Sequence, residues 1–349
     1  MNPETYDVIV IGGGQSALAV GYYLRKTDFH YLMLDKETKP GGSWRHYWDS
    51  LQLFSPAQWS SLPGVLMPGG VKHYPTREDT LNYLEKYEQR YQLPVERPVT
   101  VQQVQKENGL FKVETDRGAY FSKAVISATG SFNKPYVPNI KGLEQFQGEV
   151  LHSGRYRNNK PFEHQQVLVV GEGNSGAQIL AEVSKVARTY WATSKVPRFL
   201  PDDIDGRVLF DQASAMYAAR QAGKSYTPPS LGDIVAVPAV REARDRGAFT
   251  EHYSIHSFTE QGVVWSGGEE QFLDAVIFCT GFRPALDHLQ PLGILEADGK
   301  VATKGSRALK TEGLWLVGYG SWTGFASATL IGVGRSARQT VREAEQYLR

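Results

Sequence analysis

Two continuous apolar runs are followed directly by glycine clusters, and after each cluster the apolar positions change to helical spacing. The first run, YDVIVI at 6–11, precedes a helix-compatible stretch at 17–26 and a short apolar run at 31–34. The second lies in VLVVGEGNSGAQILAEV at 167–183 and is followed by YWAT at 190–193. Uninterrupted apolar runs are typical of parallel strands buried on both faces. We therefore predict two βαβ units and an α/β fold with two nested Rossmann-like domains.

The chain between the two units contains a different pattern. Residues 36–75 lose periodicity and collect Gly, Pro and aromatic rings, which is typical of a long segment kept for a function, and we expect it to lie over a ligand. Thr76 is placed to cap a helix. Turn residues at 108–109 and 116–118 separate three strand-like segments, which predicts an antiparallel meander. Residues 135–160 are predicted to form a linker.

The last third of the chain returns to strands after the patternless stretch 197–260. Strand patterns occur at 261–268, 272–282 and 313–320, and apolar residues at helical spacing predict a long closing helix at 323–348.

Composition and charge narrow the class of protein. With 349 residues, 41% hydrophobic and 21% charged, the chain has room for two globular domains. The formal net charge of +1 shows no excess of positive charge that would attract nucleic acid or an anionic membrane, so we expect neither as a partner. Cys279 is the single cysteine, which excludes an intramolecular disulfide and dithiol chemistry. No secretory signal pattern opens the sequence, and a cytoplasmic location is expected.

The first glycine cluster reads Gly12-x-Gly14-x-x-Ala17 between a strand and a helix, and Asp35 follows 23 residues after Gly12. Glycines there allow a pyrophosphate to approach the helix N-terminus, while the acid can accept hydrogen bonds from ribose hydroxyls. We predict a dinucleotide site. Its predicted contacts are Gly12, Gly14, Ser16, Ala17, Asp35 and Lys36.

The second cluster reads Gly171-x-Gly173-x-x-Gly176, but the position 23 residues after Gly171 is Ser194, followed by Lys195. A lysine there can attract a 2′-phosphate and favour NADPH, yet the missing acid is equally compatible with NADH, and Lys195 could be a surface residue. The coenzyme preference stays open. The predicted contacts are Gly171, Gly173, Asn174, Ser175, Gly176, Ser194 and Lys195. Two such sites in one chain suggest that one holds a flavin and the other delivers hydride.

Three further motifs resemble those of a known family. The segment 146–156 is similar to the F-x-G-x-x-x-H-x-x-x-Y/W signature of class B flavoprotein monooxygenases. The other two resemblances are a GG-S/T-W flavin segment and a pair of A/C-T-G crossings from a strand into a linker. The matching residues are Phe146, Gly148, His152 and Tyr156; Gly41, Gly42, Ser43 and Trp44; and Ala128, Thr129, Gly130, Cys279, Thr280 and Gly281.

Because Tyr156-Arg157 replaces Trp-Pro, the chain resembles the short bacterial flavin-containing monooxygenases more than the Baeyer-Villiger type. The resemblance implies an FAD domain at 1–155 plus 285–349 and an NAD(P)H domain at 160–280. It also implies a reaction in which NADPH or NADH reduces FAD, and a flavin hydroperoxide then transfers one oxygen from O₂ to a sulfide or amine. A homodimer is the default expectation.

One departure keeps alternatives open, because residues 43–66 contain no asparagine beside the flavin and Leu53 and Phe54 occupy that neighbourhood. An NAD(P)H oxidase or flavin reductase that releases peroxide is the first alternative, and a non-catalytic redox sensor is the second. Thr329, at the start of the last helix, is expected near the flavin ring. The predicted catalytic residues are Phe54, His152 and Tyr156, with His152 more suited to positioning a cofactor than to acid-base chemistry. His252 and His256 lack a third ligand, and no metal site is predicted.

Overall fold

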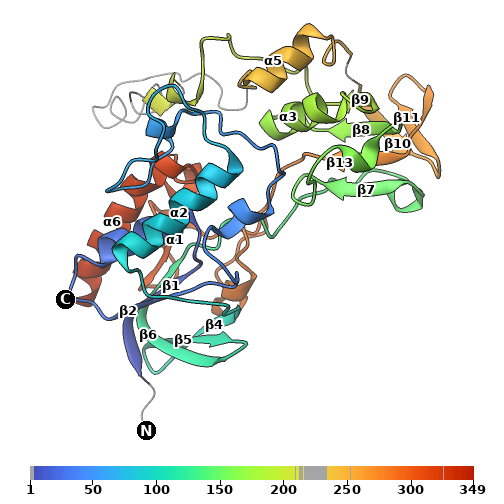
Figure 1. The fold of residues 1–349 in the computed structure, drawn as a ribbon. Helices are drawn as coiled ribbons and strands as arrows, with labels where there is room; N and C mark the ends of the chain where they lie inside the picture. The colour runs from blue at the N-terminus through green and yellow to red at the C-terminus, as the bar shows by residue number, and fades with distance from the viewer. Residues whose placement is uncertain (1–3, 209, 212–214, 216–233, 252, 325) are drawn as a thin grey trace. The chain divides into compact units, whose positions relative to one another are not determined.

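The computed structural model describes residues 4–349 except 209, 212–214, 216–233, 252 and 325 (Figure 1). The chain divides into two compact units. The first unit contains Met1–Arg45, Ser55–Lys134 and Arg283–Arg349, and the second contains His46–Phe54 and Pro135–Phe282. The boundary therefore falls at 134/135 instead of the predicted 155, and the segment 46–54 clusters with the second unit.

A mostly parallel sheet forms the centre of the first unit, with strand order β14-β15-β16-β6-β1-β2-β3. Its buried centre is β1, a run of apolar residues paired in parallel with β2 on one side and β6 on the other, as its sequence predicts. The strands are β1 (Thr5–Ile11), β2 (Tyr31–Leu34), β3 (Val95–Glu96), β6 (Gly118–Ser127), β14 (Thr303–Lys304), β15 (Arg307–Ala308) and β16 (Leu314–Leu316).

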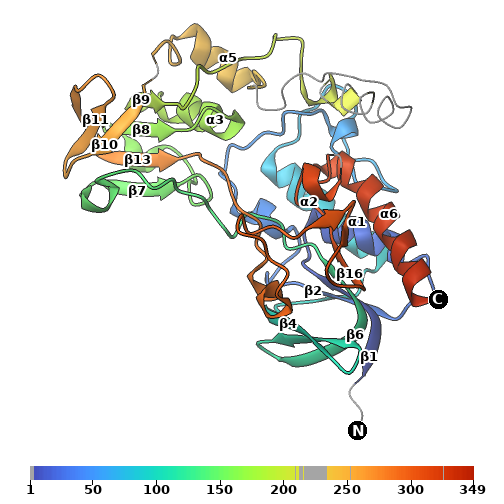
Figure 2. The same ribbon diagram turned by 180° about the vertical axis from the view of Figure 1, so that it is seen from behind.

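Helices cover one face of this sheet, and the meander packs on the other (Figures 1 and 2). The helices are α1 (Gln15–Leu24), α2 (Arg77–Tyr91) and α6 (Leu330–Leu348). On the opposite side, β4 (Val101–Glu107) and β5 (Leu110–Thr115) pack with the short helix η5 (Asp287–Leu292) around one apolar core. Asn108 and Gly109 both have positive φ, the geometry of a tight hairpin turn, as the dipeptide predicts.

Two helix starts in this unit are capped by their own side chains. The Thr76 side chain accepts a hydrogen bond from the Asp79 amide at 3.1 Å, and the Asp79 carboxylate accepts one from the Thr76 amide at 2.9 Å. This capping box confirms the predicted start of α2. The predicted helix 323–348 is wrong at its beginning, because α6 starts only at Leu330. A short 3-10 turn ends at Thr323, Gly324 and Ala326 have positive φ, and Thr329 caps α6.

A four-stranded parallel sheet, β7-β13-β8-β9, forms the centre of the second unit. Its helices α3 and α5 lie on one face, and a three-stranded antiparallel sheet packs on the other through Phe258, Val263 and Trp265 (Figure 1). The elements are β7 (Glu149–His152), β8 (Gln166–Val170), β9 (Arg188–Ala192), β13 (Ala275–Phe278), α3 (Asn174–Val183), α5 (Pro238–Asp245), β10 (Ile255–Phe258), β11 (Gly262–Trp265) and β12 (Glu270–Phe272).

The predicted linker 135–160 is wrong in part, because it contains β7. This strand pairs in parallel with β13 over four residues, Glu149 to His152, and the first two of these are exposed. So short and half-polar a run has no strand pattern of its own. The chain enters it through Gly148, where a Cβ would lie 2.5 Å from the Asp274 carbonyl oxygen, so only glycine fits this close approach.

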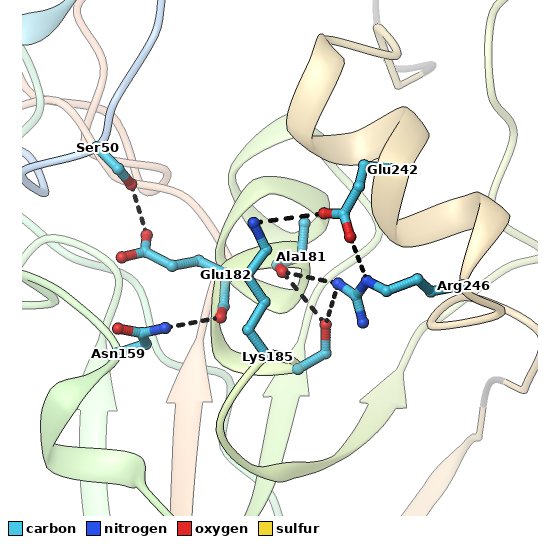
Figure 3. A network of polar contacts seen from close by, with 8 residues as sticks. Ser50, Asn159, Ala181, Glu182, Lys185, Glu242 and Arg246 are labelled. Atoms are coloured by element: carbon cyan, nitrogen blue, oxygen red, sulfur yellow. Dashed lines mark hydrogen bonds and ion pairs between the residues drawn. The ribbon is translucent and has the colours of Figure 1, made fainter.

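A polar network joins α3 to α5 and to the segment 46–54 (Figure 3). Ser50 donates to the Glu182 carboxylate at 2.6 Å, and the Asn159 side chain donates to the Glu182 carbonyl oxygen at 3.0 Å. Glu242 of α5 pairs with Lys185 at 3.3 Å and also with Arg246. Exposed ion pairs such as those of Glu242 contribute little stability. Among the described residues, no helix is both long and apolar enough to cross a bilayer.

A buried hydrogen-bonded network stands behind the end of β6. His288 contacts the Ser127 hydroxyl at 3.1 Å, Ser127 contacts the Tyr319 hydroxyl at 2.7 Å, and Tyr319 accepts from the Thr129 amide at 3.1 Å. Burial lowers the pKa of His288 from 6.5 to about 4, slightly opposed by Asp287. The imidazole is therefore neutral in the folded protein at neutral pH.

Because His288 is buried in its neutral form, we expect the folded protein to lose stability in acid. Between pH 6.5 and about 4, His288 is protonated in the unfolded chain but stays neutral in the folded chain. Lowering the pH through this range therefore reduces the free energy of unfolding, by about 3 kcal/mol at pH 4 relative to its value above pH 6.5. In His288→Gln this part of the pH dependence should disappear, which urea unfolding midpoints between pH 7 and 4.5 will measure. His30→Gln, at an exposed histidine, is the control. An unchanged slope in His288→Gln would contradict the assignment.

Candidate functional site

The start of α1 lacks the caps found on α2 and α6. Its N-cap is Gly14, no side chain of the described residues caps it, and its first turn contains no acidic residue. The first N–H groups of a helix have no partner inside the helix, and the helix dipole adds positive charge there. This end of α1 can therefore receive an anion from outside the chain.

The two glycines of the first turn are required for different reasons. Gly12 has φ +120°, and a Cβ there would lie 2.6 Å from the Ala128 carbonyl oxygen, so the fold itself demands glycine. Gly14 has an ordinary φ of −82°, and the nearest atom to its Cβ position is the Gly42 Cα at 3.8 Å. Nothing within the described fold excludes a side chain at Gly14. A Cβ at Gly14 would make only an ordinary van der Waals contact.

Asp35 lies at the end of β2, as predicted, and is 3% exposed. Its carboxylate lies against Gly13, where a Cβ would meet Oδ2 at 2.2 Å. Burial raises the pKa of Asp35, while the Arg97 guanidinium, 3.2 Å from Oδ2, opposes that rise. Arg97 is held in turn by Glu88 of α2 at 2.9 Å. Sequence patterns gave no indication of Arg97, which is separated from Asp35 by 62 positions.

The GG-S-W segment lies against this same turn. A Cβ on Gly42 would be 2.7 Å from the Gly14 Cα, so the two glycines are in backbone contact. The Trp44 indole donates to the Gln15 side chain at 3.0 Å, and Gln15 donates to the Ala328 carbonyl oxygen at 2.9 Å. Gln15 thus joins three segments distant in sequence, and no motif indicated it.

The remaining predicted contacts of the first site are distributed around it. Ser16 packs against Gly318, where a Cβ would meet the serine hydroxyl at 2.1 Å. Ala17 is buried within α1, Ser43 is half-buried in the 3-10 turn Gly42–His46, and Lys36 is exposed next to Asp35. Thr329 uses its hydroxyl to cap α6, so its side chain already has a structural partner.

The second glycine turn repeats the geometry of the first. Gly171 has φ +124°, and a Cβ there would lie 2.5 Å from the Cys279 carbonyl oxygen. A Cβ on Gly176 would lie 2.2 Å from the Gly171 carbonyl oxygen, so this position also requires glycine. Gly173, in contrast, has no atom within 4 Å of its Cβ position. The helix α3 again begins at an uncapped glycine without an acid in its first turn. Here Asn174 is engaged, because its Oδ1 accepts from the Val235 amide at 2.9 Å.

Both A/C-T-G tripeptides lie beside their glycine turns. Ala128 follows β6 and donates to the Ile11 carbonyl oxygen at 2.8 Å, while Cys279 follows β13 and donates to the Val170 oxygen at 2.7 Å. Thr129 anchors the next stretch of the first unit by donating to the Ala285 oxygen at 2.7 Å, and Thr280 does the same in the second unit with Tyr136. Gly130 and Gly281 then turn the chain with positive φ.

A cavity of about 550 Å³ opens over the second turn. Thr193, whose buried hydroxyl has no hydrogen-bond partner among the described residues, lies in its wall. An orphaned hydroxyl beside an uncapped helix fits a polar ligand. The lining comprises Tyr136, Pro138, Ile140, Val170, Gly171, Glu172, Gly173, Ala192, Thr193, Ser194, Lys195, Ser254, Ile255, Cys279 and Thr280. Ser194 and Lys195 were predicted there, and Glu172, although inside the motif, was not.

His152 of the signature is buried and uses both ring nitrogens. Nε2 contacts the Gly281 carbonyl oxygen at 3.0 Å, and Nδ1 accepts from the Gly154 amide at 3.1 Å. This pattern requires a neutral ring with its proton on Nε2, and burial accordingly lowers the pKa of His152. The geometry suits a residue that positions the Cys279-Thr280-Gly281 strand end. Its assignment as a catalytic residue stays a prediction.

The other predicted catalytic residues are also placed by packing. Tyr156 is fully buried and stacks on Phe162 with ring centroids 6.0 Å apart, and burial with the nearby Glu182 carboxylate raises its pKa. Leu53 is buried and Phe54 half-buried, and both belong to the second unit. The Phe54 carbonyl oxygen accepts from the Gly206 amide at 2.8 Å. Their roles at a flavin stay predictions.

Metal and thiol chemistry receive no support from the described residues. These contain no group of three His, Cys, Asp or Glu side chains able to hold a metal ion, and His252 lies outside them. Cys279 is buried, and burial raises the pKa of its thiol, so it is not a reactive thiolate.

Comparison with known proteins places this geometry in a family. Residues 9–198 match the family model described as pyridine nucleotide-disulphide oxidoreductase. The oxidoreductase CzcO of Bacillus subtilis is 31% identical, with 97% of this chain and 99% of that protein covered. The indole-3-pyruvate monooxygenase YUCCA8 of rice, Oryza sativa, is 28% identical over 94% of this chain and 88% of its own.

A solved structure is similar over the full chain. The flavin-containing monooxygenase from Stenotrophomonas maltophilia is 47% identical, has a TM-score of 0.91, and covers 99% of this chain and 100% of its own. Together with the two glycine turns, these likenesses confirm the predicted family and an enzyme, and they exclude the non-catalytic sensor. The chain belongs to the pyridine nucleotide-disulphide oxidoreductase family, and within it is a flavin-dependent class B monooxygenase of the short bacterial type whose cofactors are FAD and a nicotinamide dinucleotide.

Proposed function

We propose that the first glycine turn binds the diphosphate of FAD and that the second binds the diphosphate of NADPH or NADH. One observation carries this assignment. Gly14 and Gly173 are the N-cap residues of helices that no side chain in the described part of the chain caps, and a Cβ at either position would not clash with the fold. A ligand that approaches the backbone explains both glycines at once.

The surroundings of each turn fit the rest of a dinucleotide. At the first turn, Asp35 offers a carboxylate for ribose hydroxyls, and Arg97 holds that carboxylate in place. At the second turn, the Thr193 hydroxyl, which has no hydrogen-bond partner in the described part of the chain, offers polar contacts to the adenosine end together with Ser194 and Lys195. The residues present therefore suit two such cofactors. On this assignment, the first unit is the FAD domain and the second is the NAD(P)H domain.

The substrate we propose is a soft nucleophile, a thioether or an amine. When bound, FAD supplies the redox chemistry: NADPH provides two electrons, one oxygen atom of O₂ goes to the substrate and the other leaves as water. The chain contributes binding and orientation. His152, with both ring nitrogens engaged, has no free nitrogen for acid-base chemistry, which suits a thioether, since its sulfur needs no deprotonation.

The two glycines of the first turn give a matched pair of variants. Gly14→Val should fold, because a Cβ there meets only the Gly42 Cα at an ordinary contact distance of 3.8 Å, but it should lose FAD, because the side chain would occupy the space proposed for the diphosphate. Gly12→Val should instead fail to fold, since its Cβ meets the Ala128 backbone. Flavin absorbance per chain and circular dichroism will separate these outcomes. A folded Gly14→Val protein with a full complement of FAD would overturn the first assignment.

The corresponding change at the second turn tests coenzyme binding. Gly173→Val should retain FAD, while the rate of flavin reduction by NADPH at a fixed low concentration falls about 100-fold, equivalent to ~3 kcal/mol of lost binding. Anaerobic stopped-flow absorbance measures this rate, and reduction by dithionite serves as the control for an intact flavin. Wild-type reduction by NADPH in this variant would remove the second turn from coenzyme binding.

The nature of the substrate is tested by measuring how much of the NADPH consumed leads to oxygenated product and how much to hydrogen peroxide. With methyl phenyl sulfide, we expect sulfoxide to form in proportion to NADPH consumed, with hydrogen peroxide accounting for a minor share. Chromatography of the sulfoxide and a peroxidase-coupled assay measure the two products. Indole-3-pyruvate, named for the rice relative, is the comparison substrate. Turnover of indole-3-pyruvate without any sulfoxide would refute the thioether proposal, and peroxide as the sole product would favour the oxidase alternative.

A further inference from the structure

We propose that Glu172 is a specificity-determining residue for the nicotinamide coenzyme, whose carboxylate receives the adenosine ribose hydroxyl and disfavours a 2′-phosphate. The inference rests on the proposed function of the second glycine turn. It goes beyond that function by naming the residue that sets the choice between NADH and NADPH.

Glu172 is well placed for contact with a coenzyme. It stands between Gly171 and Gly173, in the turn from β8 to α3, and lines the cavity over that turn. Gly173 next to it leaves open space at its Cβ position. A dinucleotide whose diphosphate meets the start of α3 therefore passes directly beside the Glu172 side chain.

The carboxylate reaches the end of β9, where dinucleotide-binding units usually place their ribose-binding acid. It accepts a hydrogen bond from the Ser194 hydroxyl at 2.7 Å and another from the Ser194 amide at 3.2 Å. Ser194 is the position 23 residues after Gly171, at which the sequence lacks an acid. Glu172 thus supplies from the glycine turn the negative charge that is missing from the strand.

This charge persists at neutral pH. Partial burial opposes ionisation of Glu172, but the two Ser194 hydrogen bonds and the positive charge of Lys195 outweigh it, so the pKa lies below its usual value. An ionised carboxylate has about four acceptor sites, and Ser194 uses two of them. Acceptor capacity therefore remains for a ribose 2′-hydroxyl.

A 2′-phosphate at the same place meets a different situation. It brings close to two negative charges toward an ionised carboxylate that has already taken the Ser194 donors. Lys195 attracts the phosphate, yet it also attracts Glu172, whose charge partly cancels its own. The net effect is a site that accepts NADH readily and holds NADPH less tightly than its lysine alone would indicate.

The variant Glu172→Gln tests this directly in the FAD-loaded enzyme. The amide keeps the size of the side chain and removes the charge, so we expect the affinity for NADP⁺ to rise and that for NAD⁺ to stay or fall slightly. The ratio of the two dissociation constants should shift about tenfold toward NADP⁺, equivalent to ~1.4 kcal/mol. Isothermal titration calorimetry with the oxidised coenzymes measures binding without turnover.

Glu163→Gln, at an exposed glutamate outside the cavity lining, is the matched control and should leave the ratio unchanged. An unchanged ratio in Glu172→Gln, or an equal loss of both coenzymes, would overturn the inference, since equal loss indicates only a role in shaping the turn. Gly173→Val keeps the two proposals distinguishable. If it binds NADP⁺ like the wild type, the assignment of the second turn fails; if it loses both coenzymes while the Glu172→Gln ratio stays fixed, only the role of Glu172 fails.

Discussion

The starts of two helices, α1 and α3, are the feature on which the rest of this structure depends, because no side chain of the described residues caps either one. The helices α2 and α6 satisfy their first turns with the side chains of Thr76 and Thr329, whereas α1 and α3 begin at glycines without a cap. Where no side chain caps a helix start, its first N–H groups are left to water or to a bound ligand. A diphosphate bound at each turn, as proposed, would complete the local structure and would couple binding to folding there.

In each unit, the glycine turn packs against the end of a neighbouring parallel strand. A parallel strand delivers a small residue whose carbonyl oxygen lies where the first glycine of the turn would carry a side chain: Ala128 in one unit and Cys279 in the other. Beyond that residue stands a buried polar group that fixes the strand end, Tyr319 in the first unit and His152 in the second. The A/C-T-G motifs and the signature histidine thus have a structural explanation that does not require them to touch substrate.

The sequence predicted the parts whose pattern is local. Buried parallel strands such as β1 and β8 read as unbroken apolar runs, and the capping box of α2 is written in adjacent residues. The sequence did not predict β7, because its residues show no strand pattern and it becomes a strand only through its pairing with β13. Arg97 and Gln15 were missed for the same reason, since each acquires its role from partners far away in sequence. Glu172 occupies a variable position of the motif, where only its hydrogen bonds to Ser194 give it meaning.

The central claim is that one chain holds two diphosphates, each at an uncapped helix start. The most direct measurement is a crystal structure of the protein with FAD and NADP⁺, read from difference density at both turns. We expect one diphosphate within hydrogen-bond distance of the first amides of α1 and another at the first amides of α3. Density for either diphosphate elsewhere on the chain, with its helix start covered by a protein side chain, would contradict it.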